Sequence, residues 1–289
     1  MSDPGQPAFR VIGPRGIPLP VVLSSPHSGA YYPQDLLDEL RLPPTALRPL
    51  DDGPVDRIAE AACAIGATLV AATFPRAYVD LNRDAAELDP KLLAAPHPAV
   101  RVSAKVRAGL GVIPSRLAGA DLYDRPLTAL SVGRRLRLAY RPYHDQLAQL
   151  LAERRRQFGA ALLLDCHSMP SMHLGEPAAD VILGDRFGRA AHAELVRCAH
   201  ESLAGHGLRV GRNRPYAGGY ITEHYGRPAD GVSALQLEFR RSLFLDETTL
   251  EARPGLGGLP ELLCHLVQRL AEIVATRGRV APPMAALSA

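Results

Sequence analysis

Short apolar runs bounded by turn residues alternate with amphipathic stretches along the chain. The runs at 19–25 (LPVVLSS) and 68–74 predict buried strands, and the segment 55–65 between them has apolar residues at helical spacing. Strand, helix and strand joined by short links are typical of a parallel sheet with a crossover helix, so we expect an α/β fold. The same criteria predict strands at 161–168, 179–185 and 232–240 and helices at 127–156, 190–204 and 259–276, the first of them kinked or broken at Pro142.

Two segments do not follow this alternation. Residues 1–17 are rich in Pro and Gly, and we expect an irregular arm there. Residues 88–126 have no period, and long irregular stretches in compact enzymes often form part of the wall of a site. Because 289 residues without a visible linker suit one α/β domain, we expect a single domain over 1–289.

Charge and composition argue against several classes of protein. The formal net charge is only +3 and the basic residues are dispersed, without the concentrated basic face of a nucleic-acid-binding protein. No run approaches the roughly 18 consecutive apolar residues of a membrane span, and the amino terminus has no signal-peptide pattern, so we expect a cytoplasmic protein without a membrane partner. The cysteines form no CxxC pair and predict neither disulfides nor a thiolate zinc site.

The basic residues are almost all arginines, and lysine occurs only at Lys91 and Lys105. Arginine binds carboxylates through two parallel hydrogen bonds. A biased genomic base composition gives the same excess of arginine, so composition does not distinguish the two explanations.

Two histidines stand directly after predicted strands. His27 follows VVLSSP, and His167 follows LLLDC. Residues just beyond the carboxyl ends of parallel strands line the ligand crevice of α/β proteins, so these side chains converge if the strands are neighbours. One such histidine is more often a hydrogen-bonded residue at a strand end, but two at equivalent positions favour a metal site.

A catalytic zinc ion usually has three protein ligands, often two histidines and a carboxylate, and keeps one position for water. Asp52 and Asp56 stand at the start of the predicted helix 55–65 and are the candidates for the third ligand. Both also suit a purely structural role, Asp52 as a helix cap and Asp56 as a favourable charge in the first turn. The residues alone leave this choice open.

Glu238 is the candidate general base. It lies between Leu237 and Phe239 in a predicted buried strand, where an isolated carboxylate is costly unless it is paired or functional. Water made acidic by a metal still needs a base that carries its proton to the leaving amine. The alternative for Glu238 is an ion pair with Arg240 or Arg241.

Five ordered segments carry a family resemblance: SSPHSG, FPRAYVDLNRD, DCHSMP, NRPYAGGYITEHYG and ALQLEFRRSLF. As a set they resemble the N-formylglutamate amidohydrolase family, over about residues 20–275, and that family is similar to the zinc carboxypeptidases. The resemblance implies a three-layer α/β/α fold with a mixed, mostly parallel central sheet, of the zinc-carboxypeptidase or phosphorylase/hydrolase type.

The wider likeness to carboxypeptidases concerns individual motifs. VDLNR (79–83) resembles the segment whose Asn and Arg hold a substrate carboxylate, DCHS resembles the second zinc histidine, and LEFR resembles the catalytic glutamate. One departure matters, because carboxypeptidases place a glutamate three residues after the first histidine and this chain has Ala30 there. The acidic ligand must come from elsewhere, with Asp52 as the first choice and Asp56 as the second.

The resemblance implies hydrolysis of N-formyl-L-glutamate, or a close N-acyl amino acid, in bacterial histidine catabolism. One zinc ion, or another divalent metal, would be held by His27, Asp52 and His167, with Glu238 as the base and Arg76 polarising the formyl oxygen. A small substrate with two carboxylates calls for several polar partners. The candidates for substrate binding in the motif segments are Asn82, Arg83, Arg214, Tyr220, His224 and Arg240.

Some of these candidates have plain structural alternatives. Arg83 would form an ordinary ion pair with Asp80 or Asp84. The glycine pair in YAGGYITEHYG (216–226) predicts a loop that approaches the ligand closely, and the alternative is a turn rich in aromatic residues.

Two other classes of function remain open. A hydrolase with a protein nucleophile would use Cys166 or one of Ser24, Ser25 and Ser28, but the sequence has no GxSxG elbow. A non-catalytic binding protein on the same scaffold is disfavoured, because the metal ligands, the base and the carboxylate-binding residues are all present.

Overall fold

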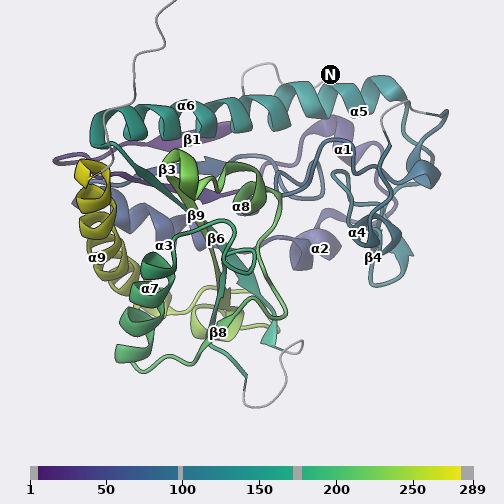
Figure 1. Cartoon of the computed structure of the whole chain (residues 1–289). Coiled ribbons are helices and arrows are strands. Elements are labelled where there is room, and N and C mark those ends of the chain that lie inside the picture. Colours follow the sequence, from purple (N-terminus) through teal and green to yellow (C-terminus); the bar gives the residue numbers. More distant parts are fainter. Residues whose placement is uncertain (1–5, 97–99, 172–177, 281–289) are drawn as a thin grey trace, which may run out of the picture.

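A mixed seven-stranded sheet forms the centre of the described residues, 6–96, 100–171 and 178–280, of a computed structural model (Figure 1). In spatial order its strands are β1 (Phe9–Ile12), β3 (Thr68–Ala72), β2 (Val21–Ser25), β6 (Ala161–Met169), β9 (Val232–Arg240), β7 (Val181–Gly184) and β8 (Val210–Arg212). The pairs β2–β3, β2–β6, β6–β9 and β7–β8 are parallel, whereas β1–β3 and β7–β9 are antiparallel. This confirms the predicted α/β fold with a mixed, mostly parallel sheet.

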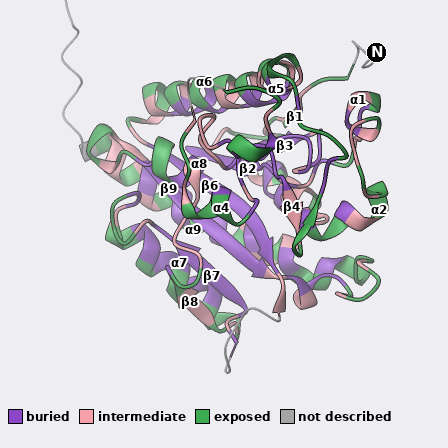
Figure 2. Ribbon diagram, turned by 90° about the vertical axis from the view of Figure 1, so that its right-hand side faces the viewer, coloured by how far each residue is buried: buried purple, intermediate pink, exposed green. Residues whose placement is uncertain are grey.

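Helices cover both faces of this sheet, each over its own apolar cluster (Figure 2). The helices are α1 (Gln34–Leu37), α2 (Pro44–Leu47), α3 (Val55–Glu60), α4 (Ala104–Arg107), α5 (Ala129–Arg135), α6 (Arg141–Phe158), α7 (Ala193–Gly205), α8 (Tyr220–Tyr225) and α9 (Leu259–Val280). One face packs against α3, α7 and α9, and the other against α6 and α8. None of the helices within the described ranges is both long and apolar enough to cross a membrane.

The central strands are apolar on both faces, which explains why they could be recognised in the sequence. In β2, Val21 and Leu23 join the cluster under α3, α7 and α9, while Val22 joins the cluster under α6. Successive side chains of a strand point to opposite faces, so a strand covered by helices on both sides has a continuous apolar run.

The amino-terminal segment contains a strand that the sequence analysis missed. Phe9–Ile12 pairs antiparallel with β3 at the edge of the sheet, and the ring of Phe9 packs edge-on against Tyr143, with ring centroids 6.2 Å apart. The expectation of an irregular arm is therefore wrong for β1, while residues 1–5 lie outside the described residues. Flanking Pro and Gly residues hid this strand, because a short edge strand is held by backbone hydrogen bonds to its neighbour and needs little side-chain periodicity.

The helical region expected at 127–156 is continuous over residues 129–158 and contains a π-helical turn directly before Arg141 and Pro142. Helix α5 ends at Arg135, Leu136–Tyr140 form a π-helical turn, and α6 begins at Arg141. Pro142 thus directly follows the π-helical turn, and a helix accommodates in this way a proline that donates no N–H and crowds the preceding turn.

The short helices α1, α2 and α4 and the hairpin of β4 (Arg116–Leu117) and β5 (Ala120–Asp121) lie to one side of the sheet, on the right of Figure 1. The irregular segment 88–126 supplies α4 and this hairpin. Lys105, Leu110 and Leu117 from this segment line the same cavity as His27 and His167. Residues of the segment 88–126 thus form part of the wall of this cavity.

Candidate metal centre and active site

His27 and His167 meet at the carboxyl ends of two neighbouring strands. His27 follows β2, His167 lies near the end of β6, and the two strands pair in parallel. Both side chains are buried, and their ring centroids are 4.8 Å apart. The convergence predicted from the two strand ends is therefore present.

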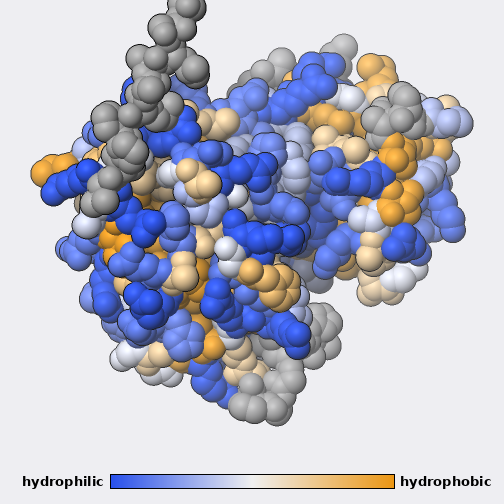
Figure 3. All heavy atoms as spheres, in the orientation of Figure 1, coloured by the Kyte–Doolittle hydropathy of each residue, from blue (hydrophilic) through white to orange (hydrophobic). Residues whose placement is uncertain are grey.

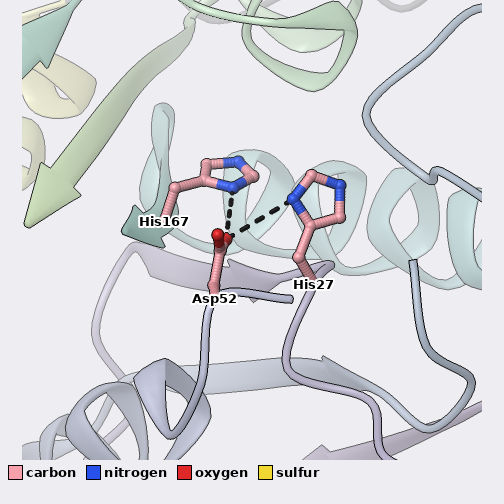
Figure 4. Close-up of side chains that lie close together, drawn as sticks. All are labelled: His27, Asp52 and His167. Carbon is pink, nitrogen blue, oxygen red and sulfur yellow. Dashed lines mark hydrogen bonds and ion pairs between the residues drawn. The ribbon is translucent and has the colours of Figure 1, made fainter. Parts of the chain in front are cut away.

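Asp52 reaches the two histidines from the turn before α3. Its Oδ2 lies 2.9 Å from Nδ1 of His167 and 3.4 Å from Nδ1 of His27, and Figure 4 shows both rings turned toward this carboxylate. The ligand atoms of the three residues all lie within 4.8 Å of one another. Asp56, the second choice, lies outside this group and pairs with Arg10 at 2.7 Å instead.

Two buried aspartates stand behind the histidines. Nε2 of His27 lies 2.8 Å from Asp80, and Nε2 of His167 lies 3.0 Å from Asp165. Because a carboxylate accepts hydrogen bonds, a neutral ring would carry its proton on Nε2, which leaves the lone pair of Nδ1 on the side of Asp52, where a metal ion would bind. Carboxylates in this position orient histidine ligands of metal ions. Sequence reasoning gave these aspartates no role in the metal site, although both lie within the quoted motifs VDLNR and DCHS.

One nitrogen in this group lacks a hydrogen bond. Nδ1 of His27 is buried and has no hydrogen-bond partner among the described residues. A buried acceptor without a partner is costly, and in a group of two imidazole nitrogens and a carboxylate oxygen a metal ion would satisfy it. The arrangement fits a divalent cation.

The electrostatics of the group also favour a cation. Burial alone would raise the pKa of Asp52, but the hydrogen bond to His167 and the nearby ring of His27 hold it well below its usual range. Burial alone would lower the pKa of His167, but the charge and hydrogen bond of Asp165, together with Asp52, raise it well above its usual range. In the metal-free protein a proton on His167 thus offsets buried negative charge that a metal ion can offset instead.

Glu238 lies on β9 directly opposite His167 of β6. Its side chain lines the same cavity, and its Oε1 accepts a hydrogen bond of 2.8 Å from Nε2 of Gln236. Burial raises the pKa of Glu238 to about 8, with nearby His167 lowering it and Asp52 raising it. The alternative of an ion pair with a neighbouring arginine is not observed, since Arg240 pairs with Asp180.

The cavity in front of His27, Asp52 and His167 has a volume of about 510 Å³. Figure 3 shows a hollow between the main body and the part on the right that carries α4, with many hydrophilic residues around it. Two carboxylate side chains, Asp52 and Glu238, line the cavity. The cationic side chains that line it are more numerous: Arg76, Arg83, Lys105, Arg186 and Arg241.

A family model described as N-formylglutamate amidohydrolase matches residues 19–245, the stretch that contains His27, Asp52, His167 and Glu238. The chain belongs to this family. Among curated relatives, the N-formylglutamate deformylase of Pseudomonas putida is 33% identical over 241 residues, which cover 80% of this chain and 83% of the relative. The N-formylglutamate deformylase of Pseudomonas aeruginosa is 32% identical over 240 residues, covering 79% and 83%.

Solved structures agree with this assignment to the family. The crystal structure of N-formylglutamate amidohydrolase from Ralstonia eutropha superposes with a TM-score of 0.88 at 39% identity, covering 94% of this chain and 100% of that one. A gene product of Agrobacterium tumefaciens has a TM-score of 0.68 at 20% identity and covers 93% of this chain and 96% of its own, so it shares the fold.

Several motif residues expected to bind substrate lie away from the cavity lining. Arg240 is held by Asp180, and Arg214 is exposed. The rings of Tyr220 and His224 stack on each other, with centroids 4.9 Å apart. The loop before α8 turns residues 215–219 toward the cavity, and the substrate-binding roles of Arg214, Tyr220, His224 and Arg240 stay predictions.

Arg76, Asn82 and Arg83 do line the cavity. The amide of Asn82 is engaged by the protein, because its Oδ1 accepts the backbone N–H of Ile221 at 2.8 Å and its Nδ2 donates to Asp165 at 3.3 Å. This arrangement makes Asn82 a residue that positions the start of α8 and the carboxylate behind His167. The guanidinium of Arg83 donates to backbone carbonyls and lies 3.8 Å from Asp80, so its pairing with Asp80 is loose.

The backbone of the glycine pair Gly218 and Gly219 lies close to another part of the chain. A Cβ on Gly219 would lie 2.3 Å from Nδ2 of Asn82, and Gly218 has a positive φ of 110°. The predicted close approach is real, but its partner is Asn82.

The sequence analysis did not identify several residues that face the cavity. These are Lys105, Arg186, Tyr216, Gln236 and, as a cavity residue, Arg241. Lys105 lies in the aperiodic segment 88–126, and Arg186 follows β7 in no motif that was recognised. Only the fold brings Lys105 and Arg186 to the cavity, whereas Tyr216, Gln236 and Arg241 lie within the quoted motifs NRPYAGGYITEHYG and ALQLEFRRSLF.

Proposed function

We propose that this protein hydrolyses the formyl amide of N-formyl-L-glutamate to formate and glutamate, as a zinc-dependent enzyme of histidine breakdown. The observation that carries the proposal is the buried group of His27, Asp52 and His167, which shares a cavity with Glu238. The relatives named N-formylglutamate deformylase support the substrate.

His27 and His167 would hold the metal through Nδ1, and Asp52 through its carboxylate. Two imidazole nitrogens and one carboxylate oxygen are a common ligand set of catalytic zinc, and other divalent metals accept the same donors. Zinc bound there supplies Lewis acidity, which makes water acidic near neutral pH and stabilises negative charge on a carbonyl oxygen. Asp80 and Asp165 keep the two imidazole rings in the tautomer and orientation that this binding needs.

Glu238 acts as the general base and then as the general acid. Its carboxylate accepts a proton from the water that attacks the formyl carbon, and the resulting acid donates that proton to the departing amine nitrogen. Burial raises the pKa of Glu238 to about 8, which favours the acid step, and the charge of a bound metal ion would favour the carboxylate that the base step needs. Arg76, whose Nε donates to Asp80 at 2.8 Å, stands in the cavity as a fixed cation for the negative charge that develops on the formyl oxygen.

The charge of the cavity matches a dianionic substrate. Its lining contains more cationic side chains than carboxylates, and a bound metal ion adds further positive charge. N-formyl-L-glutamate carries two carboxylates, and charge-assisted hydrogen bonds to arginine and lysine are strong in a partly desolvated site. Arg83, which lines the cavity, is our candidate for the carboxylate next to the scissile amide.

The rival with a protein nucleophile finds little support in the structure. Cys166 is buried in the apolar cluster on the far side of β6 from the cavity, and burial raises the pKa of its thiol. Ser24 is buried and donates to Asp165, and Ser25 and Ser28 bond to each other at 2.6 Å. None of these residues lines the cavity of the metal ligands.

The test is formate release from a panel of N-formyl and N-acetyl amino acids, with metal content measured on the same preparation. We expect turnover of N-formyl-L-glutamate that EDTA abolishes and zinc restores. Activity confined to N-acetyl compounds would refute the formyl substrate, and full activity in metal-free protein would refute the metal mechanism.

A further inference from the structure

Lys105 is a cavity residue to which the proposed mechanism gives no role. It belongs to α4, in which Oγ of Ser103 caps the first turn by accepting the N–H of Val106 at 3.2 Å. Val106 is 1% exposed and anchors this turn in the core, whereas Lys105 is exposed at the rim and lines the cavity. The turn is therefore fixed, and the flexible lysine side chain can reach inward from it.

The other cations of the cavity already have protein partners. Arg76 pairs with Asp80, Arg186 pairs with Glu223, and Arg241 donates to Ser168 and to backbone carbonyls. Lys105, in contrast, has no hydrogen-bond or ion-pair partner for its ammonium group among the described residues.

The surroundings of Lys105 are electropositive. Partial burial lowers the pKa of its ammonium group, and the charges of Arg83 and Arg76 lower it further, while Asp80 and Glu238 oppose this effect more weakly. A cation next to other cations, with no anion of its own, is an arrangement that a bound anion relieves.

The place of Lys105 in the cavity also fits one part of the substrate. Lys105 and Arg83 line the same cavity, and Lys105 is the exposed one, on the turn of α4. In N-formyl-L-glutamate the α-carboxylate is attached to the carbon that bears the scissile nitrogen, and two methylene groups carry the side-chain carboxylate outward. An exposed cation in the cavity lining matches that outer carboxylate.

We propose that Lys105 binds the side-chain carboxylate of the substrate and sets the preference for acidic over neutral N-formyl amino acids. This inference rests on the proposed function. It assigns to the irregular segment 88–126 a role in substrate specificity, because this segment carries the residue that binds the far end of the substrate.

The test compares kcat/KM for N-formyl-L-glutamate with kcat/KM for N-formyl-L-glutamine, which has a similar shape without the negative charge. Lys105→Met removes the charge and Lys105→Arg keeps it. Lys91→Met is the matched control, because Lys91 is the other lysine of the chain, is exposed and does not line the cavity. Equal thermal midpoints of the variants exclude an effect on folding.

We expect Lys105→Met to lower the glutamate-to-glutamine preference about 10- to 100-fold, mainly through KM for the acidic substrate, with turnover of the amide substrate unchanged. Lys105→Arg should keep most of the preference, and Lys91→Met should keep all of it. An unchanged preference in Lys105→Met, or an equal loss on both substrates, overturns the inference. The inference is also overturned if Lys105→Met selectively loses discrimination against N-formyl-L-isoglutamine, a compound in which the α-carboxylate is amidated and the side-chain carboxylate is free. If the proposed function itself is wrong, the wild-type protein releases no formate from N-formyl-L-glutamate. This outcome is distinguishable from a failure of the inference about Lys105, in which the wild type is active.

Discussion

His167 of β6 and Glu238 of β9 lie directly opposite each other in adjacent parallel strands. Side chains paired in this way point to the same side of the sheet, so the register of a single strand pair places a metal ligand beside the proposed base. A shift of one residue in this register would turn Glu238 toward the opposite face. The hydrogen bonds of the sheet thus fix the distance between ligand and base without help from any flexible loop.

Replacing Glu238 by Gln should leave the metal site intact and lower kcat by about 10²- to 10⁴-fold, because an amide cannot accept the proton of the attacking water. Formate release and metal content measured on the same protein check this. Glu238→Asp, which keeps a carboxylate on a shorter side chain, should retain more activity than Glu238→Gln. Near-normal rates in the amide variant would show that another group is the base.

Asp165→Asn should weaken metal binding by about 10- to 100-fold, because the carboxylate that orients His167 is lost while the ligands themselves remain. A competition titration against a chromogenic chelator measures this affinity. Asp121→Asn, which changes an exposed aspartate of β5, is the control and should bind metal like the wild type. Equal affinities in the two variants would remove Asp165 from the metal site.

The stability of metal-free protein should fall as the pH rises, in part through Glu238. Mainly through burial, folding raises the pKa of this group from 4.5 to about 8, so the folded state keeps a proton that the unfolded chain has released. The corresponding stability is present in full below about pH 4.5 and is lost as the pH rises through about 8. Asp51, whose pKa burial raises to about 7, contributes with the same sign.

Urea unfolding of EDTA-treated wild type and Glu238→Gln between pH 5 and 8 isolates the Glu238 contribution, since Asp51 is common to both proteins. The variant should lose less stability over this range than the wild type. Parallel pH profiles would contradict the raised pKa of Glu238.

Gly219→Ala should destabilise the protein by about 1–3 kcal/mol and disturb the active site, because the new methyl group would overlap the amide of Asn82. Gly133→Ala is the matched control, since a Cβ at this helical position meets no atom within 4 Å and should stabilise α5 slightly. Thermal midpoints and formate release distinguish the two variants. A neutral Gly219→Ala would mean that the loop before α8 moves away from Asn82 at little cost.

The central strands and the long helices were predictable because burial produces apolar runs or apolar residues at regular spacing within each segment, and such patterns are visible in the local sequence. The predicted strand at 232–240 coincides with β9, and α9 begins at the predicted residue, Leu259. The short edge strand β1 and the turns within 88–126 leave no such mark, because backbone pairing and contacts with distant residues hold them in place. The single-domain organisation stays a prediction.

For the site, the sequence alone determined which side chains are capable of the chemistry: His27 and His167 stand at strand ends, and Glu238 is a carboxylate in an apolar strand, all of them local properties. It left the choice between Asp52 and Asp56 open, since both suit a helix start equally well. Only the tertiary structure decided which of the two lies beside the histidines, that Asp80 and Asp165 stand behind them, and that Lys105 faces the cavity. These relationships join residues far apart in the chain, and such distances are set by strand order, register and packing, which no local pattern records.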